Sequence, residues 1–176
     1  IMNDYYAKDI SKKIRSVLKE KQKQGEYMCS IPAYGYKRHP SKKNKLIIDM
    51  QVRDVVEKIF DMYANGHGSQ KIVNYLNANK YLSPTGYRKT GIVQDENKIS
   101  YNWNEVTICN MLKNEVYIGN TIQNKRTVIS YKVKKFRTVA KNEHIRVNNT
   151  HEAIIDKDIF EKVQCIIEKK GTNTKL

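Results

Sequence analysis

The side chains that could act in catalysis are few and scattered along this chain. The four histidines, His39, His67, His144 and His151, lie far apart, and no pair of acidic residues has the spacing of a metal site. His151 is followed by Glu152, but adjacent residues on a strand point to opposite faces, so they would not act together. No glycine-rich phosphate-binding loop is present. We therefore predict no catalytic residue, no metal ligand and no cofactor in this chain.

Serine and cysteine chemistry is equally unsupported. Ser41 follows the run Tyr-Lys-Arg-His-Pro in a loop rich in proline and lysine, where nothing would activate its hydroxyl as a nucleophile. The three cysteines, Cys29, Cys109 and Cys165, are odd in number and form no Cys-x-x-Cys pair. A zinc ribbon or a disulfide framework is thus not indicated, and reduced, mostly packed thiols are expected.

The basic residues offer a different chemistry, which is the binding of a polyanion. The net charge of +15 is concentrated in two segments of the chain. Residues 1–48 hold 12 Lys and Arg against 4 Asp and Glu, and residues 119–151 hold 8 against 1. The three remaining segments are balanced, at 4 against 4, 4 against 4 and 5 against 5. Two basic segments on a neutral scaffold favour nucleic acid as the partner.

Apolar periodicity predicts the helices that would carry these charges. A long leading helix is expected over residues 3–24, with a stripe of Ile10, Ile14, Val17 and Leu18 and a stop at Gly25. Its last turn, which has no apolar residue, is expected to project from the body or to lie along a partner. Four further helical elements and a turn follow from the same reasoning: helices over 50–64, 70–79, 104–113 and a final one after Asp156, with a turn at 83–86 in a loop-rich stretch. Asn102 and Asn104 compete as the cap of the third of these.

Strand signals appear after residue 115. Segments 116–123 and 127–136 are rich in β-branched and aromatic residues, and they flank a plausible hairpin turn at 124–126. Short strands are also expected at 46–48, 144–148 and 153–155. The fold class is therefore α+β: a mostly helical compact domain with a small antiparallel sheet or hairpin, preceded by a long N-terminal helix.

Several short strings, in order, resemble the recombinase domain of large serine recombinases. They are residues 31–36, 68–77, 83–86, 103–119 and 151–164. Within them the Gly-Ser helix start, the Ser-Pro-Thr-Gly turn, Trp103 and the Tyr-Ile-Gly ending at Gly119 carry the likeness. Glu115 departs from it, because the family usually has proline there. The resemblance covers roughly residues 26–168.

The resemblance implies a DNA-binding role in a phage-integrase or transposase type of protein, acting on attachment-site DNA during integration or excision. Residues 1–25 would be the end of a long helix leaving an absent catalytic domain, 26–170 the DNA-binding domain, and 171–176 a disordered tail. The catalytic domain that carries the serine would precede this chain and a zinc ribbon would follow. The fragment itself would bind double-stranded DNA without cutting it, while the full protein would act as a dimer or tetramer on DNA.

The expected DNA contacts follow from these placements. Contacts are expected from the leading helix, the linker, the loop before Trp103 and the hairpin. Lysine and arginine would contact phosphate, and arginine is the better suited of the two to recognise bases. The predicted residues are Lys12, Arg15, Lys19, Lys21, Lys23, Tyr34, Lys37, Arg38, Arg88, Lys89, Lys98, Tyr101, Lys125, Arg126, Lys132, Lys134 and Lys135.

Two alternatives remain open on the sequence. An RNA-binding or ribosome-associated module would use the Tyr-rich basic hairpin to stack on single-stranded bases. A self-standing nuclease would need a metal, which the missing acidic cluster argues against. The chain has neither an apolar run long enough to span a bilayer nor a signal-peptide pattern, so a bacterial cytoplasmic location near the nucleoid, with no membrane partner, is expected.

Overall fold

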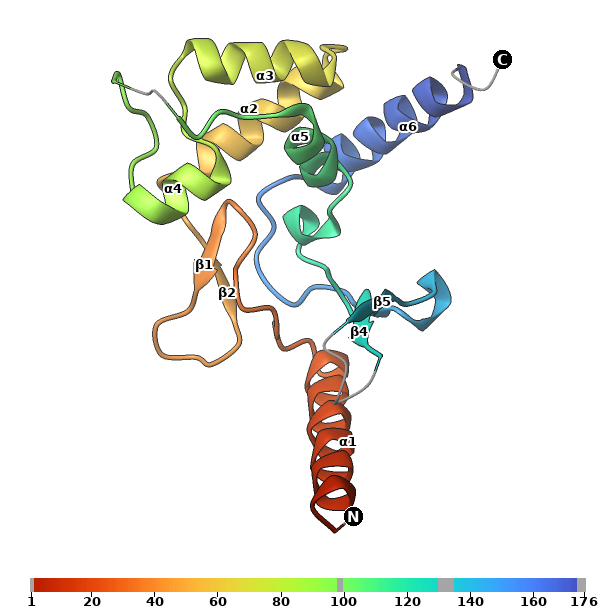
Figure 1. Ribbon diagram of the computed structural model, residues 1–176. Helices are drawn as coiled ribbons and strands as arrows, with labels where there is room; N and C mark the ends of the chain where they lie inside the picture. The colour runs from red at the N-terminus through yellow and green to blue at the C-terminus, as the bar shows by residue number, and fades with distance from the viewer. Residues whose placement is uncertain (1, 98–99, 130–134, 174–176) are drawn as a thin grey trace. The chain divides into compact units, whose positions relative to one another are not determined.

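The computed structural model describes residues 2–97, 100–129 and 135–173, which form two compact units (Figure 1). Unit 1 consists of Ile1–Pro32, Arg38–Ile47 and Gly119–Glu152, and unit 2 of Ala33–Lys37, Ile48–Ile118 and Ala153–Leu176. The longer helices are α1 Met2–Lys23, α2 Arg53–Ala64, α3 Ser69–Ala78, α4 Pro84–Thr90, α5 Glu105–Leu112 and α6 Lys157–Asn173. The strands are β1 Tyr36–Arg38, β2 Leu46–Ile48, β3 Thr121–Gln123, β4 Arg126–Val128, β5 Phe136–Thr138 and β6 Ile145–Val147. The α+β class is confirmed.

Unit 2 is a helical body with one apolar core. Helix α2 packs against α3 and α6, and α5 packs against α3 and α6. Each contributes the apolar face that its periodicity predicted, with Ile59, Ile72, Ile108 and Val163 completely buried. Burying each such side chain contributes roughly 1.5–3 kcal/mol, so this core holds the helices in fixed positions.

Tyr117 lies at the centre of that core, in the short 3₁₀ helix Glu115–Ile118. Its ring packs edge-on against Phe60 and lies near Tyr36. Its hydroxyl donates to the carbonyl of Tyr34 at 2.9 Å, and its own carbonyl accepts from the amides of Ile154 and Ile155. The segment 153–155, which was expected to be a strand, is therefore a loop. Its backbone amides donate hydrogen bonds to the Tyr117 carbonyl instead of to a neighbouring strand.

Unit 1 contains strands β3 to β6, with a pairing that differs from the expected one. Strand β3 pairs antiparallel with β6, Thr121 opposite Val147, and β4 pairs antiparallel with β5, Arg126 opposite Thr138. The predicted hairpin with its turn at 124–126 is wrong, because residues 124–125 separate two strands that belong to different sheets. Asn124 adopts a left-handed conformation there, with φ of 58°, and its amide donates to the Glu143 carbonyl.

The end of α1 is fixed within unit 1 by a left-handed glycine. Gly25 has φ of +80°, the Glu26 amide donates to the Lys21 carbonyl, and the Gly25 amide donates to the Gln22 carbonyl. This is the Schellman arrangement that ends many helices. A Cβ on Gly25 would lie 2.8 Å from Cγ2 of Thr150, so the backbone here lies directly against the segment after β6.

Gln123 connects the segment after α1 to β3. Its side-chain amide donates to the Glu26 carbonyl at 2.8 Å and accepts from the Met28 amide at 2.9 Å. With 4% exposure, this side chain takes the place of a strand partner for residues 26–28. The C-terminal end of α1 is thus attached, which corrects the expectation that this end projects.

Three smaller expectations are settled by the structure. Residues 83–86, expected as a turn, begin α4, with Pro84 in its first turn where a missing amide hydrogen costs nothing. Asn104 is the cap of α5, since its Oδ1 accepts from the Thr107 amide at 2.9 Å. Helix α6 continues to Asn173, and residues 174–176 of the predicted tail lie outside the described residues.

Candidate nucleic-acid interface

Helix α1 carries four of its basic residues as one stripe. Lys12, Arg15, Lys19 and Lys23 follow one another at spacings of three, four and four, which places them on one face of the helix. Over these residues the stripe is roughly 16 Å long. The side chains of Lys12, Lys19 and Lys23 are exposed and that of Arg15 is half-buried.

Ion pairs leave most of this stripe available. Lys23 lies 3.9 Å from Glu20, while Lys12 and Lys19 have no ion pair with any residue that the structure describes. Lys21, on the other side of the helix, is half-buried and lies 3.6 Å from Glu26. Exposed pairs of this kind are worth only about 0–1 kcal/mol, so a phosphate could replace them.

The apolar side of α1 has the predicted spacing, but it is not covered within the described residues. Ile10, Ile14 and Val17 are each more than half exposed and Leu18 is 38% exposed. The amphipathic pattern therefore correctly predicts the helix, but not that its apolar side would face solvent.

The paired strands β4 and β5 carry a second basic surface in unit 1. Lys125, Arg126 and Lys135, which are among the predicted DNA contacts, are exposed. Arg137, directly opposite Thr127 in the register, is also exposed and basic, and sequence reasoning missed it. Arg137 lies in the basic segment 119–151, which was the available signal. The expected pairing of segments 116–123 and 127–136 did not include Arg137, so it was not predicted to lie on the basic surface.

Arg38, the last residue of β1, has hydrogen-bond partners within unit 1. Its guanidinium donates to the Cys29 carbonyl at 2.6 Å and lies 3.5 Å from the Ser30 carbonyl. It therefore fixes the segment after α1 as well as presenting a charge, because a planar guanidinium can serve several acceptors at once.

In unit 2, two of the basic candidates lie on α4, which Figure 1 labels. Arg88 and Lys89 are exposed on this short helix, and the Lys89 ammonium lies 5.3 Å from the centre of the Tyr101 ring. Tyr101 is 36% exposed, so part of its ring is accessible beside the Lys89 charge. Lys37 is exposed too, 3.8 Å from Asp49.

Tyr34 is not at the surface, which corrects its placement along the DNA backbone. It is 9% exposed, and its ring packs edge-on against Tyr87 and Trp103. Burial and the nearby Tyr87 and Asp49 raise the pKa of its hydroxyl far above the ordinary value, so it stays protonated. The Tyr34 hydroxyl and the Trp103 indole nitrogen have no hydrogen-bond partner among the described residues.

The predicted contacts therefore fall into separate groups. Lys12, Arg15, Lys19, Lys21, Lys23, Arg38, Lys125, Arg126 and Lys135 belong to unit 1, and Lys37, Arg88, Lys89 and Tyr101 to unit 2. Lys98, Lys132 and Lys134 lie outside the described residues.

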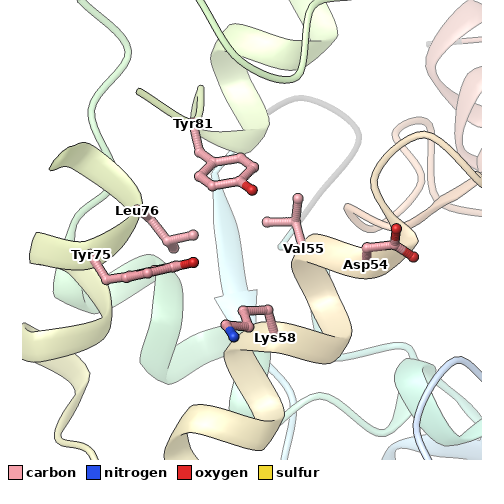
Figure 2. A pocket seen from close by; sticks show the side chains of 6 residues that line it. All are labelled: Asp54, Val55, Lys58, Tyr75, Leu76 and Tyr81. Carbon is pink, nitrogen blue, oxygen red and sulfur yellow. The ribbon is translucent and has the colours of Figure 1, made fainter. Parts of the chain in front are cut away.

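Two further features of the described residues offer no catalytic chemistry. A pocket of about 240 Å³ lies between α2 and α3, where Figure 2 shows Tyr75 and Tyr81 facing Val55 and Lys58. It is smaller than the cavities that usually hold small ligands, roughly 300–1,000 Å³. Over residues 2–97, 100–129 and 135–173, no three His, Cys, Asp or Glu side chains could hold a metal ion.

Two expectations from the sequence concern the exposure of the cysteines and the length and polarity of the helices. Cys29 and Cys165 are exposed and Cys109 is half-buried, so the expectation of mostly packed thiols is wrong. In the described part of the chain, every helix is too short or too polar to cross a membrane.

Comparison with known proteins gives a match to one family model and to several solved structures. A family model described as Recombinase matches residues 51–170. A solved structure described as a crystal structure of an LSR–DNA complex is similar with a TM-score of 0.56 and 19% identity, over 89% of this chain and 38% of that one. A second, from work on the sequence requirements of the Listeria innocua prophage attP site, has a TM-score of 0.52 and 19% identity, over 89% of this chain and 52% of that one. The chain thus spans about half or less of the proteins whose fold it shares.

Proposed function

This chain belongs to the Recombinase family, and we propose that it is the DNA-binding domain of a large serine recombinase. The family match over residues 51–170 is the observation that carries the proposal. The two solved relatives support it, since one is described as an LSR in complex with DNA and the other concerns a prophage attP site. Attachment-site DNA of a mobile element is therefore the proposed ligand, during integration or excision.

The surfaces of the two units support duplex DNA as the ligand. The stripe on α1 presents exposed lysines that can neutralise phosphates, and α4 presents two exposed cations, Arg88 and Lys89, of which Lys89 lies over the Tyr101 ring. The other parts of the proposal concern the longer protein: an upstream catalytic domain with the serine nucleophile, a downstream zinc ribbon, a dimer or tetramer on DNA, and a bacterial cytoplasmic location.

The test is fluorescence anisotropy with a labelled attachment half-site and a scrambled duplex of equal length. We expect tighter binding to the half-site and a steep loss of affinity as salt increases. Equal affinity for both duplexes at physiological salt would contradict site recognition.

A matched pair of variants tests the α1 stripe. Lys12→Ala with Lys19→Ala removes two exposed charges from the stripe, and Lys162→Ala with Lys169→Ala removes two exposed charges from α6. The first change should reduce the slope of log K against log salt by about 1.8, since each phosphate contact contributes about 0.9. The second should leave the slope nearly unchanged. A similar reduction in both would mean that only net charge matters.

Neutralising Lys37 and Arg38 should weaken binding to all sequences and flatten the salt slope. Arg38→Gln removes the charge, and because its shorter side chain also loses the bond to the Cys29 carbonyl, circular dichroism should first confirm that this variant is folded. An unchanged slope would remove both residues from the interface.

An RNA-binding role has one specific observation in its favour. Phe136 is 68% exposed on β5, between exposed Lys135 and Arg137, and an aromatic ring flanked by cations is suited to stack on an unpaired base. A single-stranded RNA of the same length in the anisotropy assay decides between the two functions. Preference for the single strand over both duplexes would favour the RNA-binding role.

A further inference from the structure

Helix α4 is too short to hold its position by itself. It has seven residues, and isolated helices of this length are unstable in water because nucleation is costly. Its C-terminal end is closed by Gly91, in the left-handed region at φ of +72°, whose amide donates to the Tyr87 carbonyl at 2.7 Å. The position of α4 must therefore depend on the side chains that attach it to the rest of unit 2.

Tyr87 is the residue of α4 that makes this attachment. Its hydroxyl lies 2.7 Å from Oδ2 of Asp49 and 2.9 Å from Oε1 of Gln51. Its ring packs edge-on against the buried Tyr34, with the ring centres 5.8 Å apart. Both hydrogen-bond acceptors precede α2, so the Tyr87 side chain joins α4 to the beginning of α2.

Asp49 is well suited to receive this hydrogen bond. It is 7% exposed, and its carbonyl accepts from the amides of Val52 and Arg53 at the start of α2. Its other carboxylate oxygen lies 3.8 Å from the Lys37 ammonium. A hydrogen bond to a buried, charged acceptor is stronger than a neutral one, so Tyr87 is attached to a fixed point.

The protonation state of Tyr87 keeps it a donor. Burial, with the hydrogen bond to Asp49, raises the pKa of its hydroxyl to about 12, and the hydroxyl therefore carries its hydrogen at any working pH. The adjacent Gly86 adds a close contact, because a Cβ there would lie 2.6 Å from Cβ of Tyr101.

The exposed charges of α4 follow immediately after this attachment. Arg88 and Lys89 are the next two residues, and both are exposed while Tyr87 and Gly86 face the body of unit 2. Successive residues of a helix are about 100° apart, so fixing Tyr87 also fixes the directions of the next two side chains. Lys89 is further restrained over the Tyr101 ring.

We propose that the Tyr87 hydroxyl is a positioning group for DNA binding: by fastening α4 to Asp49 and Gln51, it holds Arg88 and Lys89 where both can contact phosphate. The inference rests on the proposed DNA-binding function and adds a residue that does not itself touch DNA. Without the hydroxyl, α4 would no longer hold the two side chains against the phosphates, so fewer phosphate contacts would form in the complex and affinity would fall by about threefold to tenfold.

A double-mutant cycle tests the inference with the whole chain and a half-site duplex. Tyr87→Phe removes only the hydroxyl, and Arg88→Ala with Lys89→Ala removes the two charges. Tyr75→Phe is the matched control, since the Tyr75 hydroxyl has no hydrogen bond within the described residues. We expect Tyr87→Phe to weaken binding and reduce the salt slope, and to have no further effect in the chain that already lacks Arg88 and Lys89.

The salt slope separates positioning from general stability. A variant that merely unfolds more easily has fewer active molecules, but each one makes the same phosphate contacts, so the slope is unchanged. Loss of affinity by the same factor in both backgrounds, or no loss at all, would overturn the inference. Failure of the unmodified chain to bind any DNA would instead overturn the proposed function.

A second variant keeps the test valid where Tyr87→Phe does not fold. Gln51→Ala removes one acceptor from an exposed position and leaves the Asp49 bond in place. We expect about a twofold loss of affinity, which disappears when Arg88 and Lys89 are absent. Persistence of that loss in their absence would overturn the inference.

Discussion

Replacing Gln123 by leucine should detach the segment that follows α1. The change removes the donor to the Glu26 carbonyl and the acceptor of the Met28 amide, which are 2.8 and 2.9 Å from the Gln123 side chain. Gln123 is 4% exposed, so water cannot fully replace these partners. Two lost hydrogen bonds, each leaving a partly buried group unsatisfied, should lower the free energy of unfolding by about 2–4 kcal/mol.

Gln123→Glu is the control that separates the two bonds. A carboxylate can still accept from the Met28 amide, but it has no hydrogen for the Glu26 carbonyl and its charge is buried, so the loss should be at least as large as for leucine. Urea unfolding followed by circular dichroism gives the magnitudes of both losses.

Amide hydrogen exchange at Met28 gives the local result. Its amide should be protected in the native chain and in Gln123→Glu, and should exchange rapidly in Gln123→Leu. Equal protection in all three, or a loss of less than about 0.5 kcal/mol for the leucine variant, would refute the role assigned to this side chain.

Three further outcomes are expected. Gly25→Ala should cost more stability in thermal unfolding than Gly66→Ala: both have positive φ, worth about 1 kcal/mol, but only Gly25 also has a close neighbour. Equal costs would show that the contact is absent. Tyr117→Phe should cost about 1–3 kcal/mol in urea unfolding, because it leaves the carbonyl of Tyr34 unsatisfied, and a neutral result would mean that water reaches this carbonyl. Because the folded pKa of Tyr87 is raised, the stability that this residue contributes is present below about pH 10 and is lost as pH rises toward 12. In Tyr87→Phe the free energy of unfolding should therefore fall less steeply between these pH values. Identical dependence on pH in the two proteins would contradict the shift.

Helix positions could be predicted from the sequence because the signal is local. The apolar spacing of Val55, Val56, Ile59 and Phe60 is enough to predict α2, and its observed bounds differ from the expected ones only at the beginning. Whether such a face is covered depends on partners elsewhere in the chain. For this reason the same kind of pattern could not show that Ile10 on α1 would remain exposed.

The β structure and the attachment of α4 could not be predicted, because both depend on contacts distant in sequence. Val116 and Tyr117 have the composition of a strand, yet tertiary packing places them in a 3₁₀ turn inside the core. Likewise, nothing local to Asp49 indicates a bond to Tyr87, a residue 38 positions away. Tyr34 was assigned to the surface for the same reason, since burial is decided by distant residues.

The order of the strands along the chain has a consequence for how unit 1 assembles. Strands β4 and β5 both lie between β3 and β6, so one antiparallel pair is enclosed within the span of the other. Closing the inner pair joins Val128 to Phe136, whereas closing the outer pair directly would require an open loop from Gln123 to Ile145. The entropic cost of closure grows with loop length, and each doubling adds about 0.6 kcal/mol. Once β4 and β5 have paired, only short segments remain between this pair and the outer strands. The outer ladder, β3 with β6, should therefore form second.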